Sequence, residues 1–229
     1  DLDTSGMPAN ARVVAGGADE SIFQPSWSPT SMLYFVSDKS GWWNLYAHDA
    51  QGVRDVCSME ADFGRPQWAF GISAYAHLGM GGVVATFSQN GKRSMGLIDP
   101  VRGEIQILGT PYCEFDGITA MGAAVVFISA SQTDAARLVI LADGGVDSVV
   151  VRHSLDFAID PGDLSCAEAV MFPTAGPTAG GGGNQAHGFY YPPANRNFTG
   201  EGPPPLIVKS HGGPTGRGHR CHKHGWTRH

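Results

Sequence analysis

The sequence has few cysteines and no long apolar run. Its four cysteines are far apart and form no C-x-x-C pair, which argues against a zinc or redox site of that kind. No apolar run approaches the roughly 18 residues of a membrane-spanning helix. We therefore expect reduced, mostly buried thiols in a cytoplasmic protein that has no metal, no cofactor and no membrane partner. The cysteines are Cys57, Cys113, Cys166 and Cys221.

Basic residues are scarce outside the C-terminal end. The chain carries 15 Lys and Arg against 21 Asp and Glu, with a formal net charge of −6. Residues 209–229 contain basic side chains but no acidic one, so the excess of acid lies in the rest of the chain. Binding to nucleic acid draws on clustered Lys and Arg. The acidic body therefore argues against a nucleic-acid partner.

What the sequence does contain is a recurring pattern of short strands and turns. An apolar strand, a polar turn, a strand ending in Asp, a Gly turn and a third strand occur in three copies. The closing residues Asp49, Asp99 and Asp143 recur at about the 40–50-residue period of propeller blades. The expected strands are 32–36, 42–49, 53–57, 83–87, 94–99, 104–108, 124–129, 138–143 and 146–151.

Propeller blades depend on their neighbours. A four-stranded blade cannot bury both faces alone, so a set of three blades would leave two open faces. We therefore expect about three blades of a β-propeller and a chain that is incomplete at its start. Open sheet edges invite pairing, so we also expect a poorly folded or aggregation-prone product.

Aromatic residues precede each copy at a similar place. Trp27, Trp68 and Phe115 occupy these positions, and rings wedged between blades are the simplest interpretation. The doublet Trp42-Trp43 lies in an expected strand, where alternation would place one ring on each face. Packing in the core is favoured there over an exposed binding surface.

Several motifs, in order along the chain, resemble the prolyl oligopeptidase family in its dipeptidyl and acylaminoacyl peptidase branch. S-W-S-P at 26–29 and F-V-S-D-K-S-G-W-W-N-L-Y at 35–46 resemble its propeller blades, as does E-A-D-F-G-R-P-Q-W at 60–68. A-H-G-F-Y-Y-P-P at 186–193 and P-L-I-V-K-S-H-G-G-P at 205–214 resemble the opening of its hydrolase domain.

The resemblance implies a mainly β fold, with the C-terminal blades of a β-propeller followed by the first strands of a truncated α/β-hydrolase domain. Residues 1–164 would form the partial propeller and residues 165–214 the start of the peptidase domain. Residues 215–229 form a basic, His-rich tail that departs from the family. Crowded His and Cys could bind a metal, but the separated ligand pairs of a zinc site are missing, which favours an aberrant end of the reading frame.

The apolar stretch ending in His211, Gly212 and Gly213 carries the chemical expectation. A strand followed by His-Gly-Gly is how α/β-hydrolases present a backbone N–H to an oxyanion. The resemblance implies one such N–H on Gly212 or Gly213, and a plain glycine turn is the alternative. No G-x-S-x-G nucleophile elbow occurs in the 229 residues, so the family's Ser, Asp and His have no counterpart here. We expect this chain alone to be inactive.

Two acidic residues of the 60–68 stretch are candidate substrate contacts. In aminopeptidase relatives, acidic side chains between blades can meet the free amine of a substrate, which points to Glu60 and Asp62. Loop carboxylates are more often only solvated, and that interpretation is favoured here.

The sequence thus indicates a fragment of a serine-type oligopeptidase or exopeptidase that acts on short peptides. The alternative is a non-catalytic propeller that binds a protein partner, or a pseudogene product. The sequence leaves oligomer formation open.

Overall fold

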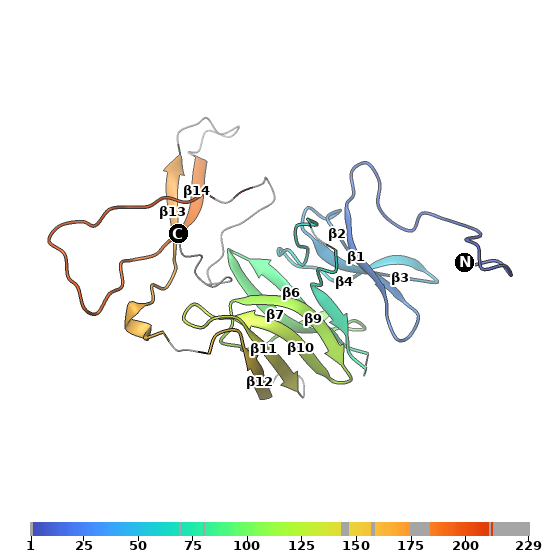
Figure 1. Cartoon of the computed structure of the whole chain (residues 1–229). Helices are drawn as coiled ribbons and strands as arrows, with labels where there is room; N and C mark the ends of the chain where they lie inside the picture. The colour runs from blue at the N-terminus through green and yellow to red at the C-terminus, as the bar shows by residue number, and fades with distance from the viewer. Residues whose placement is uncertain are drawn as a thin grey trace.

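The described part of the chain folds into three four-stranded antiparallel sheets and one separate two-stranded hairpin (Figure 1). In each four-stranded sheet the spatial order of the strands follows their order in the chain, which is the meander of a propeller blade. The computed structural model describes residues 2–68, 70–79, 81–142, 147–156, 159–174, 184–210 and 212.

Each blade is a consecutive set of four strands. Blade 1 consists of β1 (Ile22–Trp27), β2 (Leu33–Ser37), β3 (Asn44–Asp49) and β4 (Gly52–Cys57). Blade 2 consists of β5 (Tyr75–His77), β6 (Val83–Gln89), β7 (Lys92–Asp99) and β8 (Glu104–Ile107). Blade 3 consists of β9 (Glu114–Met121), β10 (Ala124–Ala130), β11 (Arg137–Ala142) and β12 (Asp147–His153).

The structure confirms the propeller blades, and it adds a strand to each copy. The sequence pattern did not show β1, β5 and β9, because these strands are short or interrupted. β5 has three residues, whereas β1 carries Gln24 at φ 49 and β9 carries Gly117 at φ 59 beside register shifts. Such bulges break the period of two on which strand recognition depends.

The second strand of the first copy begins later than expected. β3 starts at Asn44, so the prediction of a strand from Trp42 is wrong. The chain is still in a turn at this point, with Gly41 at φ 85. The expected strand ends at Asp143 and Val146 lie outside the described residues.

The core lies in two apolar layers between neighbouring blades. Blade 2 contributes to both, because alternate residues of β6 point to opposite faces: Val83, Ala85 and Phe87 join the layer shared with blade 1, and Val84 joins the layer shared with blade 3. All four side chains are at most 2% exposed. Burial of each larger one contributes about 1.5–3 kcal/mol, so the two layers hold the three blades together.

The aromatic predictions are only partly correct. Phe115 is 1% exposed and lies between blades 2 and 3, as expected. Trp27 and Trp68 are each 68% exposed, so the prediction that they wedge between blades is wrong. Trp43 packs against the layer between blades 1 and 2, while Trp42 is 40% exposed. The difference arises because Trp27 ends its strand and Trp68 lies in a loop.

Two cysteine predictions need correction. Cys57 is buried and free, and burial raises the pKa of its thiol. Cys166 is free but exposed. Cys113 is disulfide-bonded, so the expectation of a reduced thiol is wrong at this position. Disulfide formation depends on the spatial approach of two Cβ atoms, which sequence spacing does not reveal.

A short linker leads from blade 3 to the hairpin. It contains the 3₁₀ turn η2 (Pro161–Asp163), which Asp160 caps by accepting a hydrogen bond from the Gly162 amide at 2.9 Å. Arg196, from the segment after the hairpin, forms ion pairs with Asp160 and Asp163. These contacts tie the linker to the segment that follows the hairpin.

The hairpin itself consists of β13 (Glu168–Thr174) and β14 (Asn184–Tyr190), paired in continuous register. The apolar stretch after it does not form the expected strand. Leu206, Ile207 and Val208 are 76%, 90% and 83% exposed and have no ladder partner among the described residues. A strand exists only through hydrogen bonds to a neighbour, so apolar composition alone did not produce one here.

Candidate functional site

The loop of residues 60–68 joins β4 of blade 1 to β5 of blade 2 and contains both acidic candidates. Asp62 forms a two-way backbone bridge with Ser88 of β6, with N···O distances of 2.9 and 2.8 Å. Its carboxylate accepts a hydrogen bond from the Trp43 amide at 3.2 Å. The Trp43 carbonyl also accepts a hydrogen bond from the Phe63 amide at 2.7 Å. Asp62 therefore links blade 1 to blade 2.

Arg65 extends this loop to the third blade. Its Nη1 lies 2.7 Å from Oδ1 of Asp116 at the start of β9, and the side chains are 11% and 41% exposed. Gln67 donates a hydrogen bond to the carbonyl of Ile22 in β1 at 3.1 Å. The 60–68 loop thus contacts all three blades.

Gly64 is needed at its position for a steric reason. A Cβ atom there would lie 2.7–2.9 Å from three ring carbons of Trp43. Real side chains do not approach so closely, and the indole ring is held by the apolar layer behind it. The ring therefore lies flat against the loop backbone.

The two acidic candidates have different surroundings. Asp62 is half-buried, and its carboxylate accepts a hydrogen bond from the Trp43 amide. Glu60 is exposed, and its backbone carbonyl accepts a hydrogen bond from Gln89 Nε2 at 3.2 Å. For the Glu60 carboxylate, the described residues provide no partner. Glu60 is therefore the better placed of the two to meet a cationic ligand.

Of the three oxyanion-hole candidates, the structure describes only Gly212. Gly212 is exposed, and a Cβ placed on it would meet nothing within 4 Å. His211 and Gly213 lie outside the described residues, as does the 215–229 tail.

No three His, Cys, Asp or Glu side chains gather as a metal site within the described ranges. An apolar crevice between blades 2 and 3 is lined by Leu78, Val84, Leu97, Leu108, Ala123, Val125 and Leu141. With only apolar side chains, it cannot orient a peptide. In the described segments, no helix has the length and apolarity needed to cross a bilayer.

The structure also brings together a polar cluster that the sequence did not indicate. Ser26 of β1 lies 2.9 Å from the Tyr75 hydroxyl and 3.1 Å from Nε2 of His77, both in β5. Burial lowers the pKa of His77 and raises that of Tyr75. The pairing joins residues about fifty positions apart, and no local motif marks it.

Comparison with known structures identifies the fold. The chain matches puromycin hydrolase with a TM-score of 0.76 and 28% identity, over 87% of this chain and 30% of that one. A puromycin-hydrolyzing peptidase of Mycobacterium tuberculosis matches with a TM-score of 0.76 and 27% identity, over 89% and 31%. A structure from an analysis of two prolyl endopeptidases matches with a TM-score of 0.55 and 11% identity, over 77% and 25%.

No family model and no curated protein matches the sequence. The first two structural matches exceed a quarter of identical residues over most of this chain. They also agree with the motifs at 26–46 and 60–68. The chain therefore resembles peptidases of the prolyl oligopeptidase family in fold and in sequence, and it spans about 30% of the length of the puromycin-hydrolysing structures that it matches.

Proposed function

We propose that this chain supplies propeller blades and the first hydrolase strands of a serine-type peptidase that hydrolyses short peptides. The observation that carries the proposal is the match to two puromycin-hydrolysing enzymes at 27–28% identity over 87–89% of the chain. The P-L-I-V-K-S-H-G-G-P motif at 205–214 supports it, because it follows the blades in the order of the family.

The proposed division of labour follows the chain. Residues 1–164 would form the propeller part, which admits only short or unstructured peptides to the active site. Residues 165–214 would begin the hydrolase domain, whose loop at 211–213 donates a backbone N–H from Gly212 or Gly213 to the oxyanion. The nucleophile is assigned to sequence beyond this chain, since no G-x-S-x-G elbow occurs in it.

Glu60 is proposed to contact the amine of a substrate. Its exposed carboxylate offers the charge that a free α-amine requires, at the surface of a loop that contacts all three blades. Asp62 is assigned a structural role in the same loop, because its carboxylate already accepts a hydrogen bond from the Trp43 amide.

The decisive experiment begins with the gene. Its sequence beyond the Pro214 codon should be read in all three frames, and any longer product should be purified beside the 229-residue chain. We expect the longer product to hydrolyse puromycin or aminoacyl nitroanilides and to react with a fluorophosphonate, and the 229-residue chain to do neither. If every frame stops without an elbow, the non-catalytic propeller or the pseudogene product becomes the better explanation.

If the longer product is inactive, its reaction with the fluorophosphonate still separates a wrong substrate from a wrong peptidase assignment. A fluorophosphonate-reactive serine without turnover would keep the peptidase assignment and change only the substrate. Serine-directed turnover by the purified 229-residue chain, abolished by the same reagent, would contradict the assignment of the nucleophile to another stretch of sequence.

A further inference from the structure

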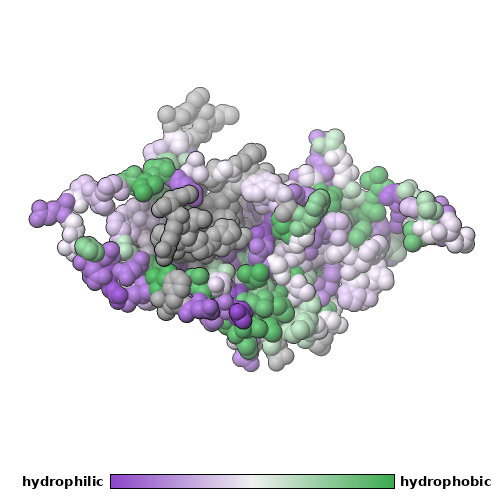
Figure 2. All heavy atoms as spheres, in the orientation of Figure 1, coloured by the Kyte–Doolittle hydropathy of each residue, from purple (hydrophilic) through white to green (hydrophobic). Residues whose placement is uncertain are grey.

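Hydrogen bonds of the backbone mark the surroundings of Glu60 more clearly than surface hydropathy does. On the face that Figure 2 shows, hydrophilic and hydrophobic residues are mixed over the blades. Glu60 is an exposed residue between Met59, which packs against the apolar layer of blades 1 and 2, and Ala61, which is buried in that layer. The chain is therefore anchored in the core on both sides of Glu60.

Asn44 holds the peptide group that precedes Glu60. Its Oδ1 accepts a hydrogen bond from the Met59 amide at 2.8 Å, and its Nδ2 donates one to the Met59 carbonyl at 3.0 Å. That carbonyl belongs to the peptide bond that leads into Glu60. Because Asn44 is only 2% exposed, water is kept away from both hydrogen bonds, which strengthens them.

Gln89 holds the peptide group that follows Glu60. Its Nε2 donates a hydrogen bond to the Glu60 carbonyl at 3.2 Å. The backbone bridge between Asp62 and Ser88 fixes the same segment against β6. Peptide groups are planar, so a residue turns only about the two backbone bonds between its flanking planes. With both planes held, the Glu60 carboxylate can move only through its side-chain torsions.

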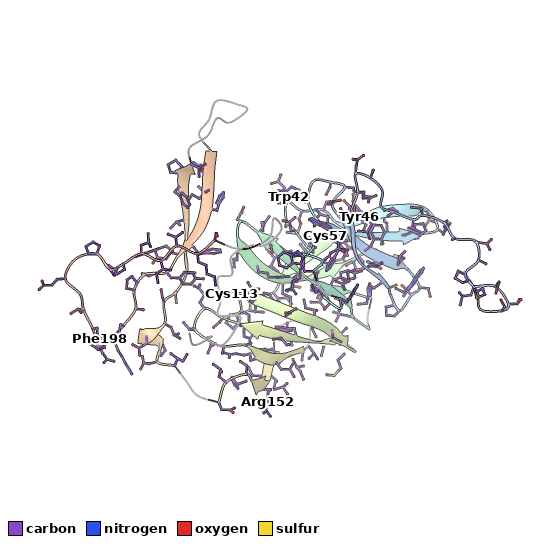
Figure 3. All side chains as sticks on the ribbon, turned by 45° about the horizontal axis from the view of Figure 1, so that its top comes forward. Trp42, Tyr46, Cys57, Cys113, Arg152 and Phe198 are labelled. Carbon is purple, nitrogen blue, oxygen red and sulfur yellow. The ribbon has the colours of Figure 1, made fainter. Side chains whose placement is uncertain are left out.

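The start of β3 brings Asn44 to this place. Leu45 pairs with Cys57 of β4, so the residues that follow Cys57 pass beside Asn44. Figure 3 shows Trp42 and Cys57, which mark the two segments, in blade 1. The contact requires an amide side chain, because one group must both donate and accept, whereas a carboxylate only accepts and an aliphatic side chain does neither.

We propose that Asn44 and Gln89 are positioning residues that hold the Glu60 carboxylate in place for the free amine of a substrate. The inference rests on the amine contact proposed above for Glu60. Neither amide touches the amine, since each acts through a peptide group beside Glu60. A carboxylate that is already held in place loses less conformational freedom on binding, so the two amides raise the affinity for peptides that carry a free amine.

Gln24 provides a matched control for Asn44. Its side-chain amide also accepts a hydrogen bond from one backbone amide and donates one to a carbonyl, those of Ala74 and Tyr75, at the joint between β1 and β5. Gln24→Ala therefore loses the same kinds of hydrogen bond as Asn44→Ala. If Asn44 had only a structural role, the two variants would behave alike.

Titration of the 229-residue chain with trialanine and with N-acetyl-trialanine, followed by NMR chemical shifts of backbone amides, tests the proposal. We expect trialanine to bind more tightly, and Asn44→Ala to raise its Kd by about fivefold or more. Gln24→Ala should leave this Kd unchanged. If Asn44→Ala does not fold, Gln89→Ala removes only a half-buried side chain and should raise the Kd about threefold.

Glu60→Gln separates this inference from the proposed function, and it should raise the Kd of trialanine by about fivefold or more. Equal binding of the two peptides, or an unchanged Kd in Glu60→Gln, would overturn the amine contact and the positioning role with it. Weaker binding by Glu60→Gln alone, with Asn44→Ala and Gln89→Ala unchanged, would overturn only the positioning role. Equal weakening by Asn44→Ala and Gln24→Ala would also overturn it, because lost stability would then explain the effect.

Discussion

The hydroxyl of Ser26 lies 3.1 Å from Nε2 of His77, and the surrounding hydrogen bonds assign the proton between them. The Tyr75 hydroxyl donates to the Gln24 carbonyl at 2.6 Å, and the Ser26 hydroxyl donates to Tyr75 at 2.9 Å. Ser26 has then used its only hydrogen, so it accepts from His77, whose neutral ring carries its proton on Nε2. The ring is also enclosed by Tyr34, with ring centroids 4.7 Å apart.

This environment predicts that stability falls in mild acid. Burial lowers the pKa of His77 in the folded chain, so the unfolded chain takes up a proton first as the pH falls. The contribution is fully present above the unfolded pKa of about 6.5 and is lost as the pH falls below it. Urea unfolding at pH 7.5 and 5.5 should show this loss, and His77→Phe should reduce it. The control is His187→Gln at an exposed position, and it should leave the loss of stability between pH 7.5 and 5.5 unaltered.

Gly64 should not tolerate a methyl group. Gly64→Ala places Cβ 2.7 Å from the Trp43 ring, and overpacking of this kind costs about 1–3 kcal/mol of unfolding free energy. Gly109→Ala is the matched control, since a Cβ at that position meets nothing within 4 Å. Thermal or urea unfolding measures both variants. Equal stability of the two would show that Trp43 moves aside freely.

Gln24 should contribute to the joint between blades 1 and 2. Its Oε1 accepts a hydrogen bond from the Ala74 amide at 2.6 Å, and its Nε2 donates one to the Tyr75 carbonyl at 2.8 Å. The side chain thus takes the place of the backbone of a neighbouring strand. Gln24→Ala leaves both backbone groups without this partner and should cost about 1–3 kcal/mol. Gln51→Ala, in an exposed turn, serves as the control and should be neutral in urea unfolding.

The ion pair between Arg65 and Asp116 should give a small, salt-dependent coupling. Because the Asp116 side chain is 41% exposed, solvent screens the pair, and a coupling energy of about 0.2–1 kcal/mol is expected. A double-mutant cycle with Arg65→Met and Asp116→Asn measures it by urea unfolding at low and high salt. Coupling above this range that does not respond to salt would indicate that the 60–68 loop, not the charge, holds the two residues.

Local patterns in the sequence were sufficient for most strands of the blades. Alternating apolar residues bounded by Gly and Asp turns, as in Val83 to Asp99, determine strands and turns over short distances, because each turn needs its own residue types. The repeat period then determined the blade architecture. The motif order along the chain indicated a resemblance to the prolyl oligopeptidase family, and the matches to puromycin-hydrolysing structures support that resemblance.

Tertiary structure decided which of these residues are functional candidates and which are structural. Asp62 and Glu60 look alike in the sequence, but only the fold brings the Trp43 amide to the Asp62 carboxylate. The same holds for Ser26 and His77, and for the exposure of Trp27 and Trp68, which depend on how neighbouring blades meet. Local sequence determined the strands because turn and strand preferences act within a few residues, whereas contacts between blades join residues about fifty positions apart and exist only after the sheets have packed.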